Sequence, residues 1–374
     1  MTTATKTIPW WRPETGDEER DMVLRVLASN YLNDGDVTTE FERRVAAALG
    51  ARYAVAVTSG TAALFLSVAA LGAGHGDEVI VPDVTFIATA NAVTLAGATP
   101  VLVDVEPGTL TMDPDAFARA ITPRTRAVIP VHVSGRAAAI ERIMEIAGAR
   151  GIAVVEDAAE ALGSRHRGRC LGTFGRAGCF SFSPNKTITT GQGGLIVTDD
   201  EALVVRLREL KDQGRPVRGT GGNDIHASLG FNFKLTNLQS AVGLAQLDRL
   251  ESRVERLAGI CRAYRRGLAG IEQLRLLPFD VDSGETPQWV DALAHDRDAL
   301  VAHLERSDMH CRPFWYPIHT QRPYLAGPGS EDRFANAMRV GPLAVWLPSA
   351  LSLSDDDVQM VCDRIRDFYR GHVA

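Results

Sequence analysis

Short apolar segments alternate with segments of helical pattern from about residue 50 to residue 213, and this alternation constrains the fold more than any other feature of the chain. Such alternation is typical of βαβ units. Most of the apolar segments are continuous, so we expect them to be buried on both faces, as in a parallel sheet covered by helices. The predicted strands are 53–57, 78–81, 100–105, 127–133, 152–156, 178–183 and 194–198. The predicted helices are 61–71, 86–96, 115–121, 137–150 and 200–213.

The C-terminal part has a different pattern. Apolar residues at three- and four-residue spacing run from Leu235 to about Gly267, which predicts one long helix or two helices with a break. Further on, we predict strands near 274–278, at 289–293 and at 311–316, and helices at 297–307 and 355–369. A chain of 374 residues is long enough for two domains. We predict a large α/β domain with an N-terminal arm at residues 1–245 and a smaller α+β domain at residues 246–374.

The composition excludes several classes of protein. The chain has 40 Lys+Arg against 46 Asp+Glu, a net charge of −6, which does not suit a strongly basic nucleic-acid-binding protein. The five cysteines are widely spaced and include no Cys-x-x-Cys pair, as expected of a protein kept reduced. We find neither an apolar stretch of about 20 residues nor an export signal at the N-terminus. We therefore predict a cytoplasmic protein with neither a membrane nor a nucleic acid as partner.

Several common enzyme motifs do not occur in the sequence. We find no Gly-x-Gly-x-x-Gly after the first strand, no Gly-x-x-x-x-Gly-Lys-Ser/Thr, no His-Glu-x-x-His and no Gly-x-Ser-x-Gly. The nine histidines form no pair at i, i+4 spacing, so no metal site is predicted. Dinucleotide oxidoreductases, P-loop NTPases, zincins and serine hydrolases are disfavoured as a result.

Three segments carry candidate chemistry. Residues 57–63, Val-Thr-Ser-Gly-Thr-Ala-Ala, lie where a buried strand ends and an apolar helix begins. The free N–H groups of a helix N-terminus suit an anion, although Thr61 would also serve as a simple N-cap. Asp157 follows a buried strand, at the edge of an α/β sheet where ligands collect, or else it caps the next turn or forms a salt bridge. Lys186 stands in a loop of hydroxyl-bearing residues and glycines, where a lysine is otherwise a solvated charge.

Together these segments match what pyridoxal 5'-phosphate requires. The cofactor needs an anion cup for its phosphate, an acid that keeps its ring nitrogen protonated, and a lysine that forms a Schiff base. The lysine amine must be deprotonated to attack, which burial or nearby cations favour. An aromatic ring that stacks on the cofactor would complete the site. Phe86 follows the next predicted strand and is the candidate, with core packing as the alternative.

The sequence resembles the DegT/DnrJ/EryC1/StrS family of sugar aminotransferases, from Pro9 to about Tyr324. The segments that carry the resemblance are 59–64 (Ser-Gly-Thr-Ala-Ala-Leu), 82–91 with its Thr-Phe-x-Ala-Thr core, 156–160 (Glu-Asp-Ala-Ala-Glu), 181–186 and 230–239. The resemblance implies the aspartate-aminotransferase fold, known as fold type I, with an α/β large domain. It also implies that Lys186 forms the Schiff base and moves protons, while Asp157 pairs with the ring nitrogen. A histidine replaces this lysine in related dehydratases, so Lys186 favours transamination.

The resemblance also assigns the other cofactor contacts. The group that would surround the phosphate comprises Ser59, Gly60, Thr61, Ala62 and Ser181. Phe86 would stack on the ring, and Glu160 would lie near the ring hydroxyl. Asn232 would reach the phosphate from the neighbouring subunit, which implies a homodimer with shared active sites.

Three stretches, 185–191, 287–293 and 317–321, look like the perosamine-synthase branch of the family. That branch implies L-glutamate as amino donor, with pyridoxamine 5'-phosphate formed between the half-reactions, and a GDP-linked 4-keto-6-deoxy sugar as acceptor. We predict amination at C4 of a GDP- or dTDP-linked 4-keto-6-deoxyhexose. The sequence departs from the branch at Gln192, where glutamate is more usual, and at Ser183-Pro184. Candidate diphosphate-binding residues, or else surface charges, are Arg215, Arg218, Arg312 and Arg322. His319 either faces the sugar or has a structural role.

Other functions remain open at this stage. An aminocyclitol or 3-keto-sugar aminotransferase would share all the cofactor residues and differ only in the substrate pocket. A non-catalytic regulatory relative would keep the fold, although the lysine, aspartate and phosphate cup count against it. A nicotinamide-dependent sugar dehydrogenase is disfavoured, because neither the glycine fingerprint nor a Tyr-x-x-x-Lys pair is present.

Overall fold

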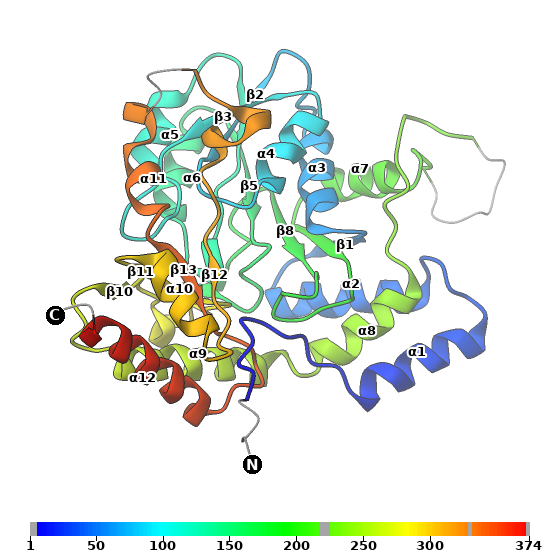
Figure 1. Ribbon diagram of the computed structural model, residues 1–374. Coiled ribbons are helices and arrows are strands. Elements are labelled where there is room, and N and C mark those ends of the chain that lie inside the picture. The colour runs from blue at the N-terminus through cyan, green and yellow to red at the C-terminus, as the bar shows by residue number, and fades with distance from the viewer. Residues whose placement is uncertain (1–5, 217–224, 328–330, 372–374) are drawn as a thin grey trace.

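The computed structural model describes residues 6–216, 225–327 and 331–371. Its main sheet has the strand order β1-β9-β8-β5-β4-β2-β3 (Figure 1). The strands are β1 (Tyr53–Val57), β2 (Glu78–Pro82), β3 (Thr99–Val103), β4 (Thr125–Val128), β5 (Ala153–Asp157), β8 (Ala177–Ser181) and β9 (Gly194–Thr198). Only β9 runs against the others, since it pairs antiparallel with both β1 and β8. The predicted α/β fold with a mostly parallel sheet is confirmed.

Helices cover both faces of this sheet, because alternate residues of its strands are buried on opposite sides. Val55 and Val57 of β1 pack into one cluster with α3 (Gly60–Ala70), α4 (Ala88–Leu95) and α7 (Glu201–Lys211). Ala54 and Ala56 pack on the other side, against α2 (Asp36–Leu49) and α8 (Asn237–Leu247). Further along that second face lie α5 (Pro114–Ala120) and α6 (Ile140–Gly148). The short turns from strand to helix therefore gather at one edge of the sheet.

A second, antiparallel sheet is built from the C-terminal part in the order β10-β11-β13-β12. These strands are β10 (Leu274–Leu276), β11 (Val290–Ala294), β12 (Arg312–Pro313) and β13 (Ala344–Leu347). They share a core with α9 (Leu250–Gly267), α10 (Arg297–Glu305) and α12 (Asp355–Gly371). The long amphipathic stretch is thus two helices, α8 and α9, with the break at Asp248 and Arg249.

The N-terminal arm packs against this C-terminal part. Ile8 forms a bridge with Met309, and the ring of Trp10 lies 5.2 Å from that of Trp289 and 5.8 Å from that of Trp346. Residues 8–11 therefore share a core with the C-terminal part, from Trp289 onwards. The proposed boundary at residue 245 stays a prediction.

Some elements differ from the sequence prediction. The helix predicted at 86–96 begins at Ala88, which leaves Phe86 in the turn before it, and the strand predicted at 127–133 ends at Val128. Elements that were not predicted are α1 (Asp17–Ser29), α2, α11 (Ala335–Val340), β13, and the hairpin of β6 (Arg165–His166) and β7 (Arg169–Cys170). Within the described ranges, no helix is long and apolar enough to cross a membrane.

Candidate active site

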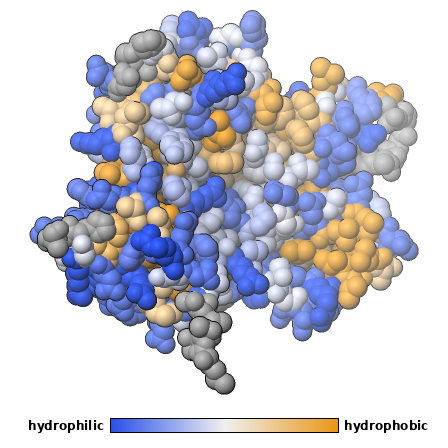
Figure 2. Space-filling model, viewed as in Figure 1, coloured by the Kyte–Doolittle hydropathy of each residue, from blue (hydrophilic) through white to orange (hydrophobic). Residues whose placement is uncertain are grey.

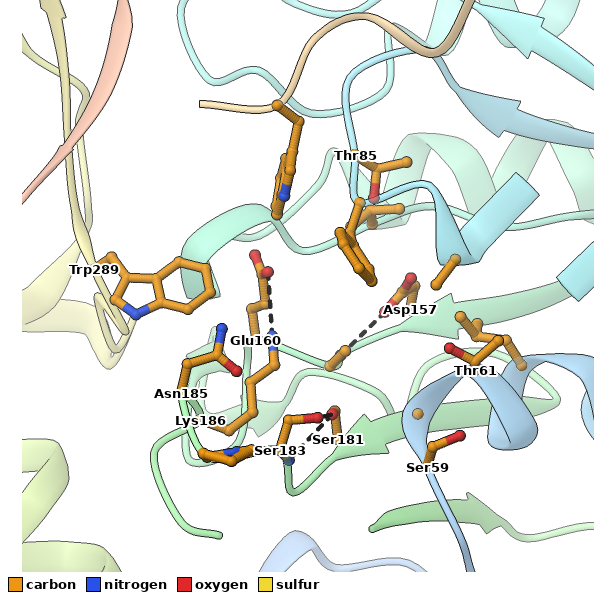
Figure 3. Close-up of a pocket in the computed structure, with 18 of the residues that line it drawn as sticks. Ser59, Thr61, Thr85, Asp157, Glu160, Ser181, Ser183, Asn185, Lys186 and Trp289 are labelled. Carbon is orange, nitrogen blue, oxygen red and sulfur yellow. Dashed lines mark hydrogen bonds and ion pairs between the residues drawn. The ribbon is translucent and has the colours of Figure 1, made fainter. Parts of the chain in front are cut away.

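A cavity of about 510 Å³ opens at the carboxyl edge of the main sheet. Its wall is formed by the β1–α3 turn, the β2–α4 turn, the end of β5 and the loop after β8, together with tryptophans of the C-terminal part (Figure 3). Open α/β sheets bind ligands at this edge. Among the residues singled out from the sequence, the cavity wall includes Ser59, Gly60, Thr61, Phe86, Asp157, Glu160, Ser181, Lys186 and Arg312.

The first turn of α3 forms one end of the cavity. Ser59 caps this helix, because its Oγ accepts a hydrogen bond from the Ala62 N–H at 3.1 Å. Gly60 lies so close to β8 that a Cβ there would meet the Cβ of Ser181 at 2.9 Å. Gly194 lies below the same turn, where a Cβ would meet the Ser59 carbonyl oxygen at 2.2 Å. These close approaches fix the helix N-terminus beside the Ser181 hydroxyl, an arrangement that suits an anion.

Asp157 ends β5 and is buried in the cavity wall. Its Oδ2 accepts a hydrogen bond from the Thr89 hydroxyl at 2.8 Å, and its Oδ1 accepts one from the Ala159 N–H at 3.1 Å. Burial raises the pKa of Asp157, while these two donors and the electrostatic interaction with Lys186 act in the opposite direction. Among the described residues, no basic side chain forms an ion pair with this carboxyl group. The site therefore favours a ligand with a positive charge at this point.

Lys186 approaches the cavity from the loop after β8 and pairs with Glu160 (Figure 3). Its Nζ lies 3.3 Å from Glu160 Oε1, and the two side chains are only 12% and 6% exposed. The second oxygen of Glu160 accepts a hydrogen bond from the Ser134 N–H at 2.8 Å. Burial raises the pKa of Glu160, and the charge of Lys186 opposes that shift. The lysine is therefore not the solvated loop charge that the alternative interpretation allowed.

Aromatic side chains enclose the rest of the cavity. Phe86 is 52% exposed, so its ring is open to the cavity rather than packed in the core. Trp289, Trp315 and Trp346 line the opposite wall, and the guanidinium of Arg312 lies above the ring of Trp346 at 5.7 Å.

Several candidate residues do not line the cavity of this chain. Asn232 is exposed and its backbone forms a bridge with Asp212, while Arg215 lies 3.7 Å from the same aspartate. His319 is buried, with its Nδ1 2.6 Å from Asp83 Oδ2. Arg322 is outside the cavity wall, and Arg218 is outside the described residues. The roles assigned to these residues stay predictions.

Some residues of the site were not predicted from the sequence. Thr89 belongs to the Thr-Phe-x-Ala-Thr core, and its hydroxyl lies 3.2 Å from that of Thr85, the first residue of this core. Trp289 lies in the stretch 287–293, but no role was predicted for it. Trp315 and Trp346 gave no local signal, because only the tertiary fold brings the second sheet to the edge of the first.

The residues present fit pyridoxal phosphate. The cavity offers an anion cup at α3, a buried carboxyl group without an ion-pair partner among the described residues, a lysine held inside, and an aromatic ring on the wall. A phosphate and a protonated ring nitrogen would match the first two features. An α/β protein with this lysine and carboxylate arrangement has the properties of a fold type I aminotransferase.

Comparisons with known proteins also identify the chain as an aminotransferase. The model of the DegT/DnrJ/EryC1/StrS aminotransferase family matches residues 13–366, so the chain belongs to this family. It is 36% identical to GDP-perosamine synthase of Escherichia coli O157:H7, over 97% of this chain and 99% of the relative. It is also 36% identical to GDP-perosamine synthase of Caulobacter vibrioides, over 93% and 95% of the two chains.

Solved structures are similar over nearly the whole chain. DesI, solved in the presence of its TDP-sugar product, matches with a TM-score of 0.89 and 32% identity, over 98% of this chain and 96% of DesI. Spr1654 of Streptococcus pneumoniae, named as a sugar aminotransferase and solved in its PLP-form, matches with a TM-score of 0.92 and 25% identity, over 98% and 99%. The predicted family, fold class, pyridoxal phosphate dependence and sugar aminotransferase activity are confirmed.

Proposed function

We propose that this aminotransferase moves an amino group from L-glutamate to C4 of a GDP- or dTDP-linked 4-keto-6-deoxyhexose. The relatives named GDP-perosamine synthase and the structure of DesI with its TDP-sugar product support this acceptor class. The observation that carries the proposal is the position of Lys186, whose Nζ is held inside the cavity between the anion cup and the aromatic wall.

Each group of residues has a proposed task. The first turn of α3 and the Ser181 hydroxyl would hold the cofactor phosphate, and Phe86 would stack on the ring. Asp157 would hold the ring nitrogen protonated, and Glu160 would lie near the ring hydroxyl. When bound, pyridoxal phosphate supplies an electron sink that stabilises the negative charge left when an amino carbon loses its proton.

Lys186 would act as the base and the acid of both half-reactions. Its Nζ takes the proton from the amino carbon and holds it as an ammonium until it is delivered again. Glu160 stabilises the ammonium during this interval, since its Oε1 is 3.3 Å away and its other oxygen is fixed by Ser134. The aromatic wall excludes water from the reacting atoms, and Arg312 would pair with the diphosphate of the substrate.

The variant Lys186→Ala tests this assignment. We expect it to retain pyridoxal phosphate in the phosphate cup but to lose glutamate-dependent formation of 2-oxoglutarate by about 10²–10⁴-fold or more. Lys6→Ala is the matched control, because Lys6 is exposed, pairs with the buried Asp357 and lies outside the cavity wall, so its loss is expected to leave turnover unchanged. Full transaminase activity of Lys186→Ala would refute the assignment.

A panel of acceptors tests the sugar. The pyridoxamine form of the enzyme is mixed with GDP-, dTDP- and UDP-linked 4-ketosugars, with a 3-ketosugar and with a keto-cyclitol, and return of the pyridoxal absorption is followed. We expect the GDP- or dTDP-linked 4-ketosugar to react fastest. A faster reaction of the 3-ketosugar or the cyclitol would favour the alternative aminotransferases, and a protein without any absorption change would favour a regulatory relative.

We infer that the working unit is a homodimer with shared sites. Asn232 is exposed and lies outside the cavity of its own chain, so a contact with the cofactor phosphate requires a second copy. Apolar side chains of Leu24, Leu27, Tyr31 and Leu32 gather on the surface around α1, which supports an interface between copies (Figure 2).

Mixed variants test the sharing. Asn232→Asp would place a negative charge near the phosphate and inactivate the site, as Lys186→Ala does by another route. In mixed dimers, one site receives both changes and the other receives neither, so co-refolding the two inactive variants is expected to restore about a quarter of normal activity. No recovery, together with a monomeric mass in solution, would contradict the shared site.

A further inference from the structure

The ammonium of Lys186 contacts a second group besides Glu160. Its Nζ lies above the ring of Trp289, at 4.9 Å from the ring centroid, while Glu160 Oε1 is 3.3 Å away (Figure 3). An aromatic face attracts a cation through its quadrupole, and the attraction increases where water is excluded. Trp289 is only 1% exposed and the lysine side chain 12%, so this contact is largely desolvated.

The ring of Trp289 is held rigidly in this position. It packs between Trp10, at 5.2 Å, and Trp346, at 4.9 Å. The preceding residue, Gln288, donates its backbone N–H to the Ser134 carbonyl oxygen at 2.9 Å and accepts a hydrogen bond on its Oε1 from the Thr187 hydroxyl at 3.3 Å. Residues 288 and 289 therefore contact residues 187 and 186, respectively, which holds the two segments together.

Glu160 and Trp289 approach the same atom from different parts of the fold. Glu160 follows β5 of the main sheet, and Trp289 precedes β11 of the second sheet. Both are buried and fixed by other contacts, so the place where they meet exists before the lysine enters it. A carboxylate and an aromatic face together offset the loss of hydration that a buried ammonium would otherwise suffer.

We propose that Trp289 is a positioning residue that, with Glu160, forms a docking place for the Nζ ammonium of Lys186 whenever that amine is not bonded to the cofactor. The proposal rests on the proposed function, in which the free lysine holds a proton between its removal and its delivery. Trp289 keeps the protonated amine inside the cavity and in one direction. It does not itself exchange a proton, because its indole N–H is not acidic in this range.

The test measures the lysine in the cofactor-free protein. Only the neutral amine is acylated, so a group that stabilises the ammonium slows the reaction. The wild type, Trp289→Phe and Trp289→Leu are treated with acetic anhydride at fixed pH, and acetylation of Lys186 is compared by peptide mass spectrometry with that of exposed Lys6 in the same sample. We expect the Lys186/Lys6 ratio to rise about threefold to tenfold in Trp289→Leu and by less in Trp289→Phe, which keeps a smaller ring.

Trp315→Leu is the matched control, since it removes an indole from the same cavity wall and leaves the ring over Lys186 in place. Its labelling ratio is expected to stay within experimental error of the wild type. An unchanged ratio in Trp289→Leu, or an equal rise in Trp315→Leu, would overturn the proposal. If Trp289→Leu does not fold, Trp289→Phe decides alone, and a ratio equal to the wild type counts against the proposal.

A second readout uses the loaded enzyme. If Trp289 positions the lysine, Trp289→Phe is expected to lower kcat with glutamate while the KM for glutamate stays constant. A rise in KM without loss of kcat would show that the ring contacts substrate instead. Because the acetylation experiment contains neither cofactor nor substrate, its outcome is independent of which sugar the enzyme aminates, so the two proposals can fail separately.

Discussion

A buried ion pair between Arg136 and Asp291 connects the two parts of the molecule. Arg136 follows the short helix η1 (Val133–Gly135) of the large part, and Asp291 lies in β11 of the second sheet. Their charged atoms are 2.8 Å apart, and the side chains are 3% and 1% exposed. The guanidinium also donates to the Pro278 carbonyl oxygen at 2.7 Å and to the Thr109 carbonyl oxygen at 2.8 Å.

Arg136→Met would remove this cation and leave the charge of Asp291 buried without its ion-pair partner. Removal of one member of a buried pair costs about 3–5 kcal/mol of unfolding free energy, because the remaining charge is not compensated. If the chain unfolds as one cooperative unit, this corresponds to a fall in Tm of about 4–6 °C. The double variant Arg136→Met/Asp291→Leu removes both charges, so we expect it to recover most of the loss.

The loss should depend on pH. Burial raises the pKa of Asp291, and Arg136 opposes that shift, so the variant raises this pKa further. A carboxyl group that binds its proton more tightly in the folded state contributes stability at low pH and loses it as pH rises through its folded-state pKa. The deficit of Arg136→Met is therefore expected to be larger at pH 8 than at pH 5.

Urea unfolding followed by tryptophan fluorescence suits this test, because all five tryptophans lie in or against the cluster that joins the two parts. The control is Arg142→Met, which breaks an exposed pair with Glu145 and should cost less than about 1 kcal/mol. A loss below about 1 kcal/mol in Arg136→Met, or a deficit that does not change with pH, would refute the reasoning.

Three further predictions concern the site and the thiols. Thr89→Val removes a hydroxyl donor to Asp157, so the pKa of that carboxyl group rises. We expect the Kd of the cofactor to increase by about tenfold or more, and the effect to become larger as pH falls. An unchanged Kd would contradict this prediction. In Gly194→Ala the new methyl group would press against the Ser59 carbonyl oxygen, so we expect a loss of about 1–3 kcal/mol of unfolding free energy, measured by urea unfolding. Gly108→Ala is the control, because a Cβ there meets nothing within 4 Å, and it should not cause this loss. Equal stabilities of the two variants would contradict the close approach. Burial raises the pKa of Cys261 to about 11, and the other four thiols are buried or partly buried, so Ellman's reagent at pH 8 should label no thiol of the native protein within minutes; prompt labelling would show that the core opens.

The strands and helices of the main sheet were predictable, because continuous apolar segments and the turns between them are local features. Helix α1 was not anticipated, since it carries exposed apolar residues such as Leu24 and Leu27 that do not form an ordinary buried stripe. Strand β13 has four buried residues and a partner on each side, and its position depends on pairing with residues far away in the sequence.

The candidate site also has a part that could be predicted from the sequence and a part that could not. Asp157 ends a strand, while the turn at Ser59 and the loop of Lys186 each follow one. The carboxyl ends of parallel strands meet at one edge, so the convergence of these residues followed from the topology. The contact of Lys186 with Trp289 joins two sheets, and no periodicity predicts which residue of the second sheet faces the first. Residues that contact the substrate are the hardest to predict, because the second sheet and the segments beside it form much of the cavity wall.

The charges of the cavity explain how a protein with a net charge of −6 accepts an anionic cofactor. Among the described residues that line it, Asp157 and Glu160 carry negative charge, while Lys186 and Arg312 carry positive charge. The negative groups lie at the end of β5, and the anion cup at α3 consists of backbone N–H groups and hydroxyls without a formal charge. A simple phosphate would gain nothing from the carboxylates, and a simple cation would gain nothing from the cup. A molecule with a phosphate at one end and a protonated ring at the other uses both, so the site discriminates by the separation of charges within the ligand rather than by its total charge.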